Sequence, residues 1–152
     1  MPNPRSTATI GRHPVHPIVV PFPIAFFAAA FICDLIFWGT NNDACVSASV
    51  WLLGCGLIVA ALAAALGFID FAGDVQVRNL ADVWLHAGGN VAVVLIEACN
   101  WYARYRYGAP AILPAGLVLS LVALLVLLFT GWKGWQLVNH HRVGIADKVA
   151  AE

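Results

Sequence analysis

The sequence predicts an all-α integral membrane protein that folds as an up-down-up-down four-helix bundle. Hydrophobic residues make up 61% of its 152 residues, charged residues only 11%, and the mean hydropathy is +0.82. Soluble domains average about 45 to 50% apolar and about 25% charged residues. In addition, four apolar stretches reach the roughly 20 residues that a helix needs to cross a bilayer. These stretches and their short connectors fill the chain, so we expect one transmembrane domain over residues 1–152.

The first predicted span covers residues 17–39, within and after the segment "GRHPVHPIVVPFPIAFF" (Gly11 to Phe27). Its apolar run exceeds the about 7 to 15 residues of a signal-peptide core, and no convincing cleavage site follows it. Pro17 suits the first turn of a helix, where an N–H has no intrahelical partner. Pro21 and Pro23 remove further donors, so the start of this helix is expected to be irregular.

Residues 48–71, 80–102 and 111–135 are the other three predicted spans. Tryptophan side chains prefer the two membrane interfaces. Near one end of the spans lie Trp84, Trp132 and Trp135, and near the other end lie Trp38, Trp51 and Trp101. The tryptophan positions are therefore consistent with the predicted boundaries.

Basic residues predict the orientation of the chain. Four spans place both termini on one face of the membrane, here called side A, and the opposite face is side B. Side A receives Arg5, Arg12, Arg78, Lys133, Arg142 and Lys148, whereas side B receives Arg104 and Arg106. Because positive charge favours the cytoplasmic face, we expect a multi-pass protein of the bacterial inner membrane with both termini cytoplasmic. The net charge of zero and the absence of a basic run argue against nucleic acid as a partner.

All five histidines are expected at side A. His13 and His16 precede the first span, His86 lies one to two turns inside the third, and His140 and His141 follow the fourth. Neutral imidazole is the commonest protein ligand for metals, and it also binds haem iron. We therefore predict a site for haem b, or for non-haem iron or copper, with ligands among His13, His16, His86 and His141. The alternative is that the histidines are interfacial residues that satisfy backbone groups around the prolines.

The motif "HPVHP" predicts how two of these side chains are presented. Proline pushes the residue before it out of the helical region, so His13 and His16 are expected on an extended strap and not on a regular helix. Arg12, together with one of these two histidines, is predicted to bond a haem propionate. His86 and His141 are then the expected ligands from facing helices.

A polar stripe runs along the third span. His86, Asn90, Val93, Glu97 and Asn100 recur at spacings of four, three, four and three, which places them on one helix face. Polar groups face lipid only at a high cost, so the stripe is expected to point into the bundle. Two glycines beside Asn90 would let a neighbouring helix or a flat macrocycle approach the backbone, and Asn90 is predicted to line the cofactor site.

Three carboxylates are candidates for a proton relay: Glu97 in the third span, Asp34 in the first, and Asp70 at the side-A end of the second. An acidic residue inside a membrane marks a functional site by default, and a neutral acid bonded to a neighbour is the competing structural role. Asp70 is either an interfacial residue or the acceptor of a histidine ring proton.

The cysteines indicate neither a zinc site nor a redox pair, because none has CxxC spacing. Cys33, Cys45, Cys55 and Cys99 are all expected in the side-B half, as small apolar residues buried between helices. The alternative is a disulfide that involves Cys45, if side B is oxidising. The chain also lacks a P-loop, a G-x-S-x-G elbow, an H-E-x-x-H motif and a CxxCH motif, so any haem would be bound non-covalently.

These features together resemble a family of bacterial predicted membrane proteins of unknown function, with a pattern like HPxHP near the start and GGxLVYxHGVGV near the end. The similar segments here are "HPVHP", "FPI", "GFID", "HAGGN" and "GWQLVNHHRVGI", in this order over nearly the whole chain. On recurring family positions lie His13, His16, Asp70, His86, Asn90, His141 and Gly144, whereas Trp135, Asn139 and Arg142 depart from the pattern. Some family members are joined to Rieske-type iron–sulfur domains, which implies redox work, although this chain carries no such domain.

The leading hypothesis is a membrane component of electron transfer and not a stand-alone enzyme. It would pass electrons between a partner protein and quinone, or anchor a redox partner to the bilayer. The alternative is a small transporter, channel or assembly subunit in which the histidines sense or relay protons. A homo-oligomer or a larger membrane complex is compatible with both hypotheses.

Overall fold

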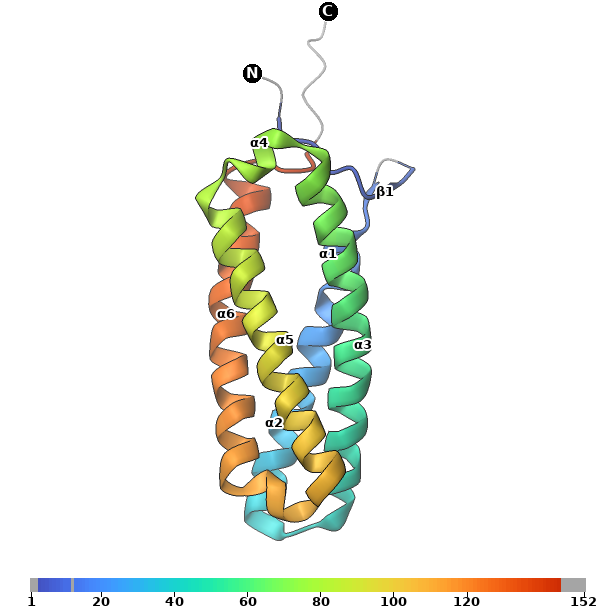
Figure 1. Ribbon diagram of the computed structural model, residues 1–152, viewed down its shortest axis with the longest axis vertical. Helices are drawn as coiled ribbons and strands as arrows, with labels where there is room; N and C mark the ends of the chain where they lie inside the picture. The colour runs from blue at the N-terminus through green and yellow to red at the C-terminus, as the bar shows by residue number, and fades with distance from the viewer. Residues whose placement is uncertain (1–2, 12, 146–152) are drawn as a thin grey trace, which may run out of the picture.

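The computed structural model describes residues 3–11 and 13–145 and is mostly helical. Its long helices are α2 (Pro21–Thr40), α3 (Asp43–Gly73), α5 (Ala81–Tyr107) and α6 (Leu117–Asn139). They run side by side along the long axis of the molecule, with the α2–α3 and α5–α6 connections at one end and α4 at the other (Figure 1). Helix α2 packs on α3 and α6, and α5 packs on α6 and α3, so α2 and α5 lie diagonally opposite.

Short elements occupy both ends of the long helices. At side A lie α1 (His16–Val19), α4 (Val75–Arg78) and the antiparallel pair of β1 (Thr9–Ile10) and β2 (His13–Pro14). At side B, the 3-10 helix η1 (Ala109–Ala111) and the π-helical turn η2 (Ile112–Gly116) lead into α6. The backbone N–H of Gly144 donates to the carbonyl of Pro4 over 2.9 Å, so the two ends of the described chain meet at side A.

Proline and asparagine determine where the helices of the first half begin and end. Val20 separates α1 from α2 although its own backbone is helical, because Pro21 brings no N–H to the hydrogen-bond ladder. Asn41 ends α2 in the left-handed region (φ 52°), which asparagine tolerates better than most residues. The side chain of Asn42 then accepts the N–H of Ala44 over 2.9 Å and begins α3.

Three helical segments of the described chain are long and apolar enough to cross a membrane: His16–Thr40, Asp43–Gly73 and Ala109–Asn139. They contain three of the four predicted spans, so the prediction of membrane helices is confirmed there. Helix α5 is long enough but less apolar, because charged residues such as Glu97 and Arg104 lie along it.

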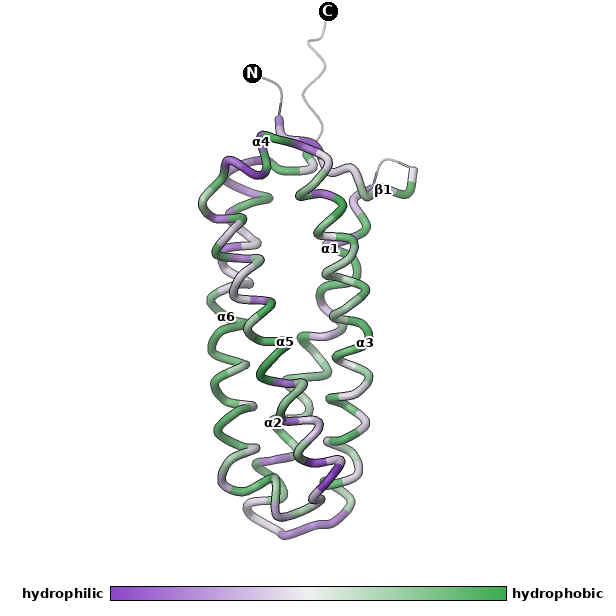
Figure 2. The backbone as a smooth tube through the Cα atoms, viewed as in Figure 1, coloured by the Kyte–Doolittle hydropathy of each residue, from purple (hydrophilic) through white to green (hydrophobic). Residues whose placement is uncertain are grey.

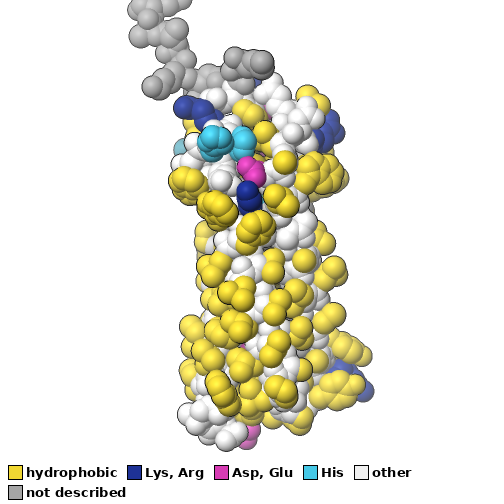
Figure 3. All heavy atoms as spheres, turned by 90° about the vertical axis from the view of Figure 1, so that its left-hand side faces the viewer, with side chains coloured by type: hydrophobic (Ala, Val, Ile, Leu, Met, Phe, Trp, Pro, Cys, Tyr) yellow, Lys and Arg dark blue, Asp and Glu magenta, His cyan; other side chains and the backbone are white. Residues whose placement is uncertain are grey.

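Apolar side chains cover the outside of the molecule as well as its interior. Hydrophobic groups occupy the middle of the face in Figure 3, and histidine, acidic and basic side chains gather toward its ends. The backbone coloured by hydropathy shows the same trend along α3 and α6 (Figure 2). Trp51 and Ile58, for example, are 74% and 73% exposed. A surface of this kind fits lipid better than water.

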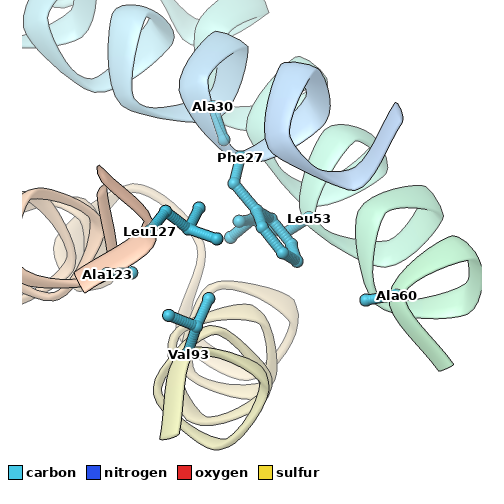
Figure 4. Close-up of a cluster of buried hydrophobic side chains, with 7 residues drawn as sticks. All are labelled: Phe27, Ala30, Leu53, Ala60, Val93, Ala123 and Leu127. Atoms are coloured by element: carbon cyan, nitrogen blue, oxygen red, sulfur yellow. The ribbon is translucent and has the colours of Figure 1, made fainter. Parts of the chain in front are cut away.

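The main core cluster lies about halfway along the helices and is here called the apolar layer. Its members are Phe27, Ala30, Leu53, Ala60, Val93, Ala123 and Leu127. Figure 4 shows the ring of Phe27 reaching from α2 to a point between Leu127, Val93 and Leu53. All four long helices therefore contribute to one continuous core.

The side-B end corrects one expectation from the sequence. Arg104 was expected among the charges of the side-B face, but its side chain is only 1% exposed. Helix α5 continues to Tyr107, beyond the predicted end of the span, and carries Arg104 inward to Asp34 of α2. A charge count along the sequence cannot distinguish a loop arginine from one that is paired inside the bundle.

Candidate functional site

His16 is held by α3 from the first turn of α1. Its Nδ1 lies 2.8 Å from the backbone carbonyl of Ala63. The same ring lies on Gly67, where an added Cβ would stand 3.0 Å from the imidazole Cε1. The expectation that His16 lies off the helices is wrong, because these two contacts hold it in a helical first turn despite the proline that follows.

His86 is held by α6 in the same manner. Its Nδ1 lies 2.9 Å from the backbone carbonyl of Thr130, and its Cε1 would lie 3.0 Å from a Cβ added to Gly134. Asn90, one turn along α5, donates to the backbone carbonyl of His86 over 2.8 Å and accepts from Thr130 Oγ1 over 3.3 Å. The ring is thus fixed by groups on two helices.

The two imidazoles lie next to each other in an edge arrangement and are here called the histidine pair. The ring centres of His16 and His86 lie 6.2 Å apart, with the ring planes at 89°. A carbonyl oxygen only accepts hydrogen bonds, so in each ring the Nδ1 donates a proton to its carbonyl. The side-chain amide nitrogen of Asn90 also lies 3.3 Å from His86 Nε2, within hydrogen-bond distance of its lone pair. A ring proton donated to a backbone carbonyl is also the usual way in which proteins orient histidines that bind metals.

The other predicted ligands lie elsewhere. His13 is exposed in β2, and His141 Nε2 lies 2.9 Å from Asp82 Oδ2, which leaves that ring engaged with a carboxylate. Asp82 also accepts from Lys133 over 2.9 Å. Within residues 3–11 and 13–145, no three histidine, cysteine or acidic side chains are grouped to hold a metal ion. Arg12 lies outside the described residues.

Asp70 organises the N-terminal segment. One of its carboxylate oxygens accepts the Ser6 hydroxyl over 2.9 Å and the backbone N–H groups of Thr7 and Ala8 over 2.7 Å each. Asp74 accepts the N–H of Arg5 over 2.8 Å in a similar way. Of the two roles left open for Asp70, the structure supports the interfacial one.

A second group of polar residues, here called the polar cluster, lies in the side-B half. Its members are Asp34, Glu97, Asn100, Arg104 and Ser120, each no more than 1% exposed. Arg104 bonds both oxygens of Asp34, with Nη2 2.8 Å from Oδ2. The Ser120 hydroxyl donates to Asp34 over 2.7 Å, and Asn100 accepts from Arg104 Nε over 3.0 Å. The charge pair is thus surrounded by the hydrogen bonds that a buried ion pair needs.

Glu97 lies at the edge of the polar cluster. Asn100 donates to its Oε2 over 3.0 Å, while Oε1 has no hydrogen-bond partner among the described groups. On α5, the apolar Val93 lies between Glu97 and the histidine pair, and Phe27 of α2 fills the same level. The polar stripe therefore points inward as predicted, but the apolar layer interrupts it.

Sequence reasoning missed some of the residues that make these contacts. Arg104 could have been found, because it follows Asn100 by four residues and so continues the polar stripe. The groups that hold the two histidines had no such signal. Ala63 and Thr130 act through their backbone carbonyls, and Gly67 and Gly134 act through the absence of a side chain. A side-chain motif in the sequence cannot indicate a backbone carbonyl or a missing side chain.

The cysteines of the described chain are all free, but the expectation that all four lie between helices is wrong for Cys99, which is exposed. Cys45 is buried, Cys99 is exposed, and the remaining two are partly buried. None of them lies in the histidine pair or the polar cluster.

Comparison with known proteins gives one match. A family described as "Predicted membrane protein (DUF2231)" matches residues 12–147, which includes the histidine pair and the polar cluster. No curated protein and no solved structure matches the chain.

Proposed function

Because the chain belongs to this family of predicted membrane proteins, we propose that it crosses the membrane four times, in up-down-up-down order. Helix α5 is the fourth span, since its polar residues face the other helices and its outward side chains, such as Val91 and Leu95, are apolar and exposed. With Arg104 buried, Arg106 is left as the basic residue of the described side-B end. The basic residues at side A favour a cytoplasmic location of both termini in a bacterial inner membrane.

We further propose that the histidine pair binds haem b through its two Nε2 atoms. Metal–imidazole bonds are about 2.0 to 2.1 Å long, so two imidazoles that would share one metal can have ring centres roughly 6 Å apart. The 6.2 Å separation of His16 and His86 matches this spacing. This agreement, with both Nδ1 protons already donated to carbonyls, is the observation that carries the proposal.

The surroundings also favour haem over a bare metal ion. Two imidazoles without a third protein ligand suit haem, in which the porphyrin nitrogens supply the remaining ligands. Non-haem iron or copper would require further ligands beyond His16 and His86.

Bound haem would supply one-electron redox chemistry at the side-A half of the bundle. The chain then accepts electrons from a partner and passes them to quinone, or anchors a redox partner to the bilayer. Asp82, Lys133 and His141 lie at the same end and are partly exposed, so they offer charged contacts to such a partner. A larger membrane complex with that partner is part of this proposal.

The absorption spectrum tests the haem. Protein purified after haem-replete expression is expected to show a Soret band that disappears in His16→Ala and in His86→Ala. His140→Ala is the matched control, because His140 is exposed and lies outside the histidine pair. A colourless wild-type protein, or a Soret band that survives both changes in the pair, would refute the haem proposal.

The competing function is a small transporter or channel in which protons move through the histidines and Glu97. The unpaired Oε1 of Glu97 favours it, because a buried acid without a partner on one oxygen is suited to binding a proton. The apolar layer opposes it, since no polar side chain bridges Asn90 and Glu97. Proton flux into liposomes that is lost in Glu97→Gln would favour transport over electron transfer.

A further inference from the structure

We propose that the chain is a tandem duplication of one helical hairpin. The first copy comprises α1, α2 and α3, the second comprises α5 and α6, and a twofold axis along the bundle relates them. His16 and His86 are equivalent residues of the two copies. If the histidine pair binds haem as proposed above, each copy would contribute one of the two histidines that hold it.

The contacts of the two histidines are the first support. Each ring bonds a backbone carbonyl on the second long helix of its own copy, at Ala63 and at Thr130. In each copy, the glycine four residues further along that helix lies under the ring. The distances from an added Cβ to Cε1 and Nδ1 are 3.0 and 3.2 Å at both Gly67 and Gly134.

The order of buried residues is the second support. In α3 the buried positions are Cys45, Ser49, Leu53, Gly56, Ala60 and Ala63. Over η2 and α6 they include Ile112, Gly116, Ser120, Ala123, Leu127 and Thr130, with the same spacings of four, four, three, four and three. Any helix with one buried face repeats spacings of three and four, so the spacings alone do not show a duplication. The alignment of α3 with α6 that matches the buried positions also pairs Ala63 with Thr130 and Gly67 with Gly134, and this agreement supports the duplication.

The first helices of the two copies agree in the same way. The buried positions Phe27, Ala30 and Asp34 of α2 correspond to Glu97, Asn100 and Arg104 of α5. Asp34 and Arg104 are 70 positions apart, which is also the separation of His16 and His86. One offset therefore aligns two pairs of residues that meet in space at different depths of the bundle.

The arrangement of the helices is the third support. In Figure 1, α5 crosses in front from one side at the top to the other side at the bottom, and α2 makes the opposite crossing behind it. Helices α3 and α6 run along the two edges of the same view. A half-turn about the vertical axis exchanges α2 with α5 and α3 with α6.

The duplication gives Asp34 and Arg104 a role in specificity. Equivalent positions of two identical hairpins would bring like side chains together near the axis. Opposite charges at these positions favour pairing of the first hairpin with the second, and two copies of either hairpin would bury two like charges. Asn100 and Ser120 strengthen this preference, because the equivalent residues of the first copy are Ala30 and Leu53.

Exchange of the two charges tests the equivalence of their positions. Asp34→Arg and Arg104→Asp each bury two like charges, whereas the double variant restores an opposite pair. We expect the double variant to regain at least half of the melting temperature that the less stable single variant loses in detergent. It should stay below wild type because Asn100 and Ser120 remain on α5 and α6. If neither single variant folds, a folded double variant is the expected result. A double variant that is no more stable than the less stable single variant overturns the proposal.

The glycine pair supplies a second test that needs neither haem nor a large perturbation. Gly67→Ala and Gly134→Ala should shift the ring signals of His16 and His86, respectively, by similar amounts in nitrogen NMR of histidine-labelled protein. Gly131→Ala is the control, since an added Cβ there meets nothing within 4 Å. A shift in only one member of the pair contradicts the equivalence. If the protein is colourless but gives the expected results in the charge exchange and in the glycine substitutions, only the haem proposal is refuted. If the protein binds haem but fails both of these tests, only the duplication is refuted.

Discussion

At the scale of single residues, the burial of Arg104 is the feature with the highest energetic cost, because a charged group is removed from water. Burial of a guanidinium with 1% exposure requires compensation of its charge and of its nitrogen donors. Each of its three nitrogens donates at least one hydrogen bond to Asp34, Asn100 or Ser120. Removal of one partner of a buried ion pair strongly lowers the stability of the fold, because the other charge is left unpaired. Replacement of both charges by apolar groups is often tolerated.

Removal of the arginine alone is therefore expected to be severe. Arg104→Met leaves the Asp34 carboxylate buried without its partner and should lower the free energy of unfolding by about 3 to 5 kcal/mol. Thermal unfolding in detergent measures this loss. The double variant Asp34→Leu with Arg104→Met should recover most of it, and equal losses in the two variants would contradict this account.

The attachment of the N-terminal segment is expected to depend on pH through Asp74. Hydrogen bonds from the N–H groups of Arg5 and Gln76 hold the pKa of this carboxyl below its usual value. A lowered pKa means that the charged form is stabilised in the folded protein, so the attachment is complete at neutral pH and is lost as pH falls through the lowered pKa.

Hydrogen exchange at the amide of Arg5 measures this attachment. After correction for intrinsic exchange, protection should stay constant from neutral pH down to the unperturbed Asp pKa of about 3.9 and should fall at lower pH. Asp74→Asn is the control, since its side chain does not titrate. Protection with the same pH dependence in both proteins would show that Asp74 is not responsible.

At the scale of the helices, Phe27 connects the two halves of the bundle. Its ring is 2% exposed and packs at the level where all four long helices meet (Figure 4). Phe27→Ala should lower the free energy of unfolding by about 3 to 5 kcal/mol, because the cavity closes only in part. Phe22 is 57% exposed on the same helix, so Phe22→Ala is the matched control and should change little. Equal losses would contradict the assignment of the core.

The helices also show what sequence patterns can and cannot predict. The polar stripe of α5 was predictable because helical periodicity places Asn90, Glu97 and Asn100 on one face. The partner of each histidine was not, because it is a backbone carbonyl whose position depends on how two helices pack. The role of Asp70 was ambiguous for a related reason. Its carboxylate accepts hydrogen bonds from the main-chain N–H groups of Thr7 and Ala8, and a main-chain N–H leaves no mark in the sequence.

At the scale of the whole molecule, the two ends differ in what they expose. Side A carries the ion pair and hydrogen bonds of Asp82, Lys133 and His141, whereas side B has short connections and keeps its main charge pair buried. The two ends of the molecule therefore present different polar groups at their surfaces.

Cysteine labelling is expected to confirm the proposed orientation. In a background without the native cysteines, His140→Cys at side A should react with a membrane-impermeant maleimide in inverted vesicles and not in intact spheroplasts. Tyr107→Cys at side B, where the native side chain is 67% exposed, should react in the opposite way. The reverse pattern would place the termini outside the cytoplasm.

The way each histidine is oriented also determines when the site is completed during synthesis. His86 leaves the ribosome well before Thr130, whose carbonyl fixes the ring. His16 likewise waits for Ala63. The first hairpin can therefore orient His16 while the second hairpin is still being translated. A molecule that needs both rings can be bound only after α6 has entered the bilayer. Insertion of the last helix is thus the step that completes the histidine pair and, with it, the proposed haem site.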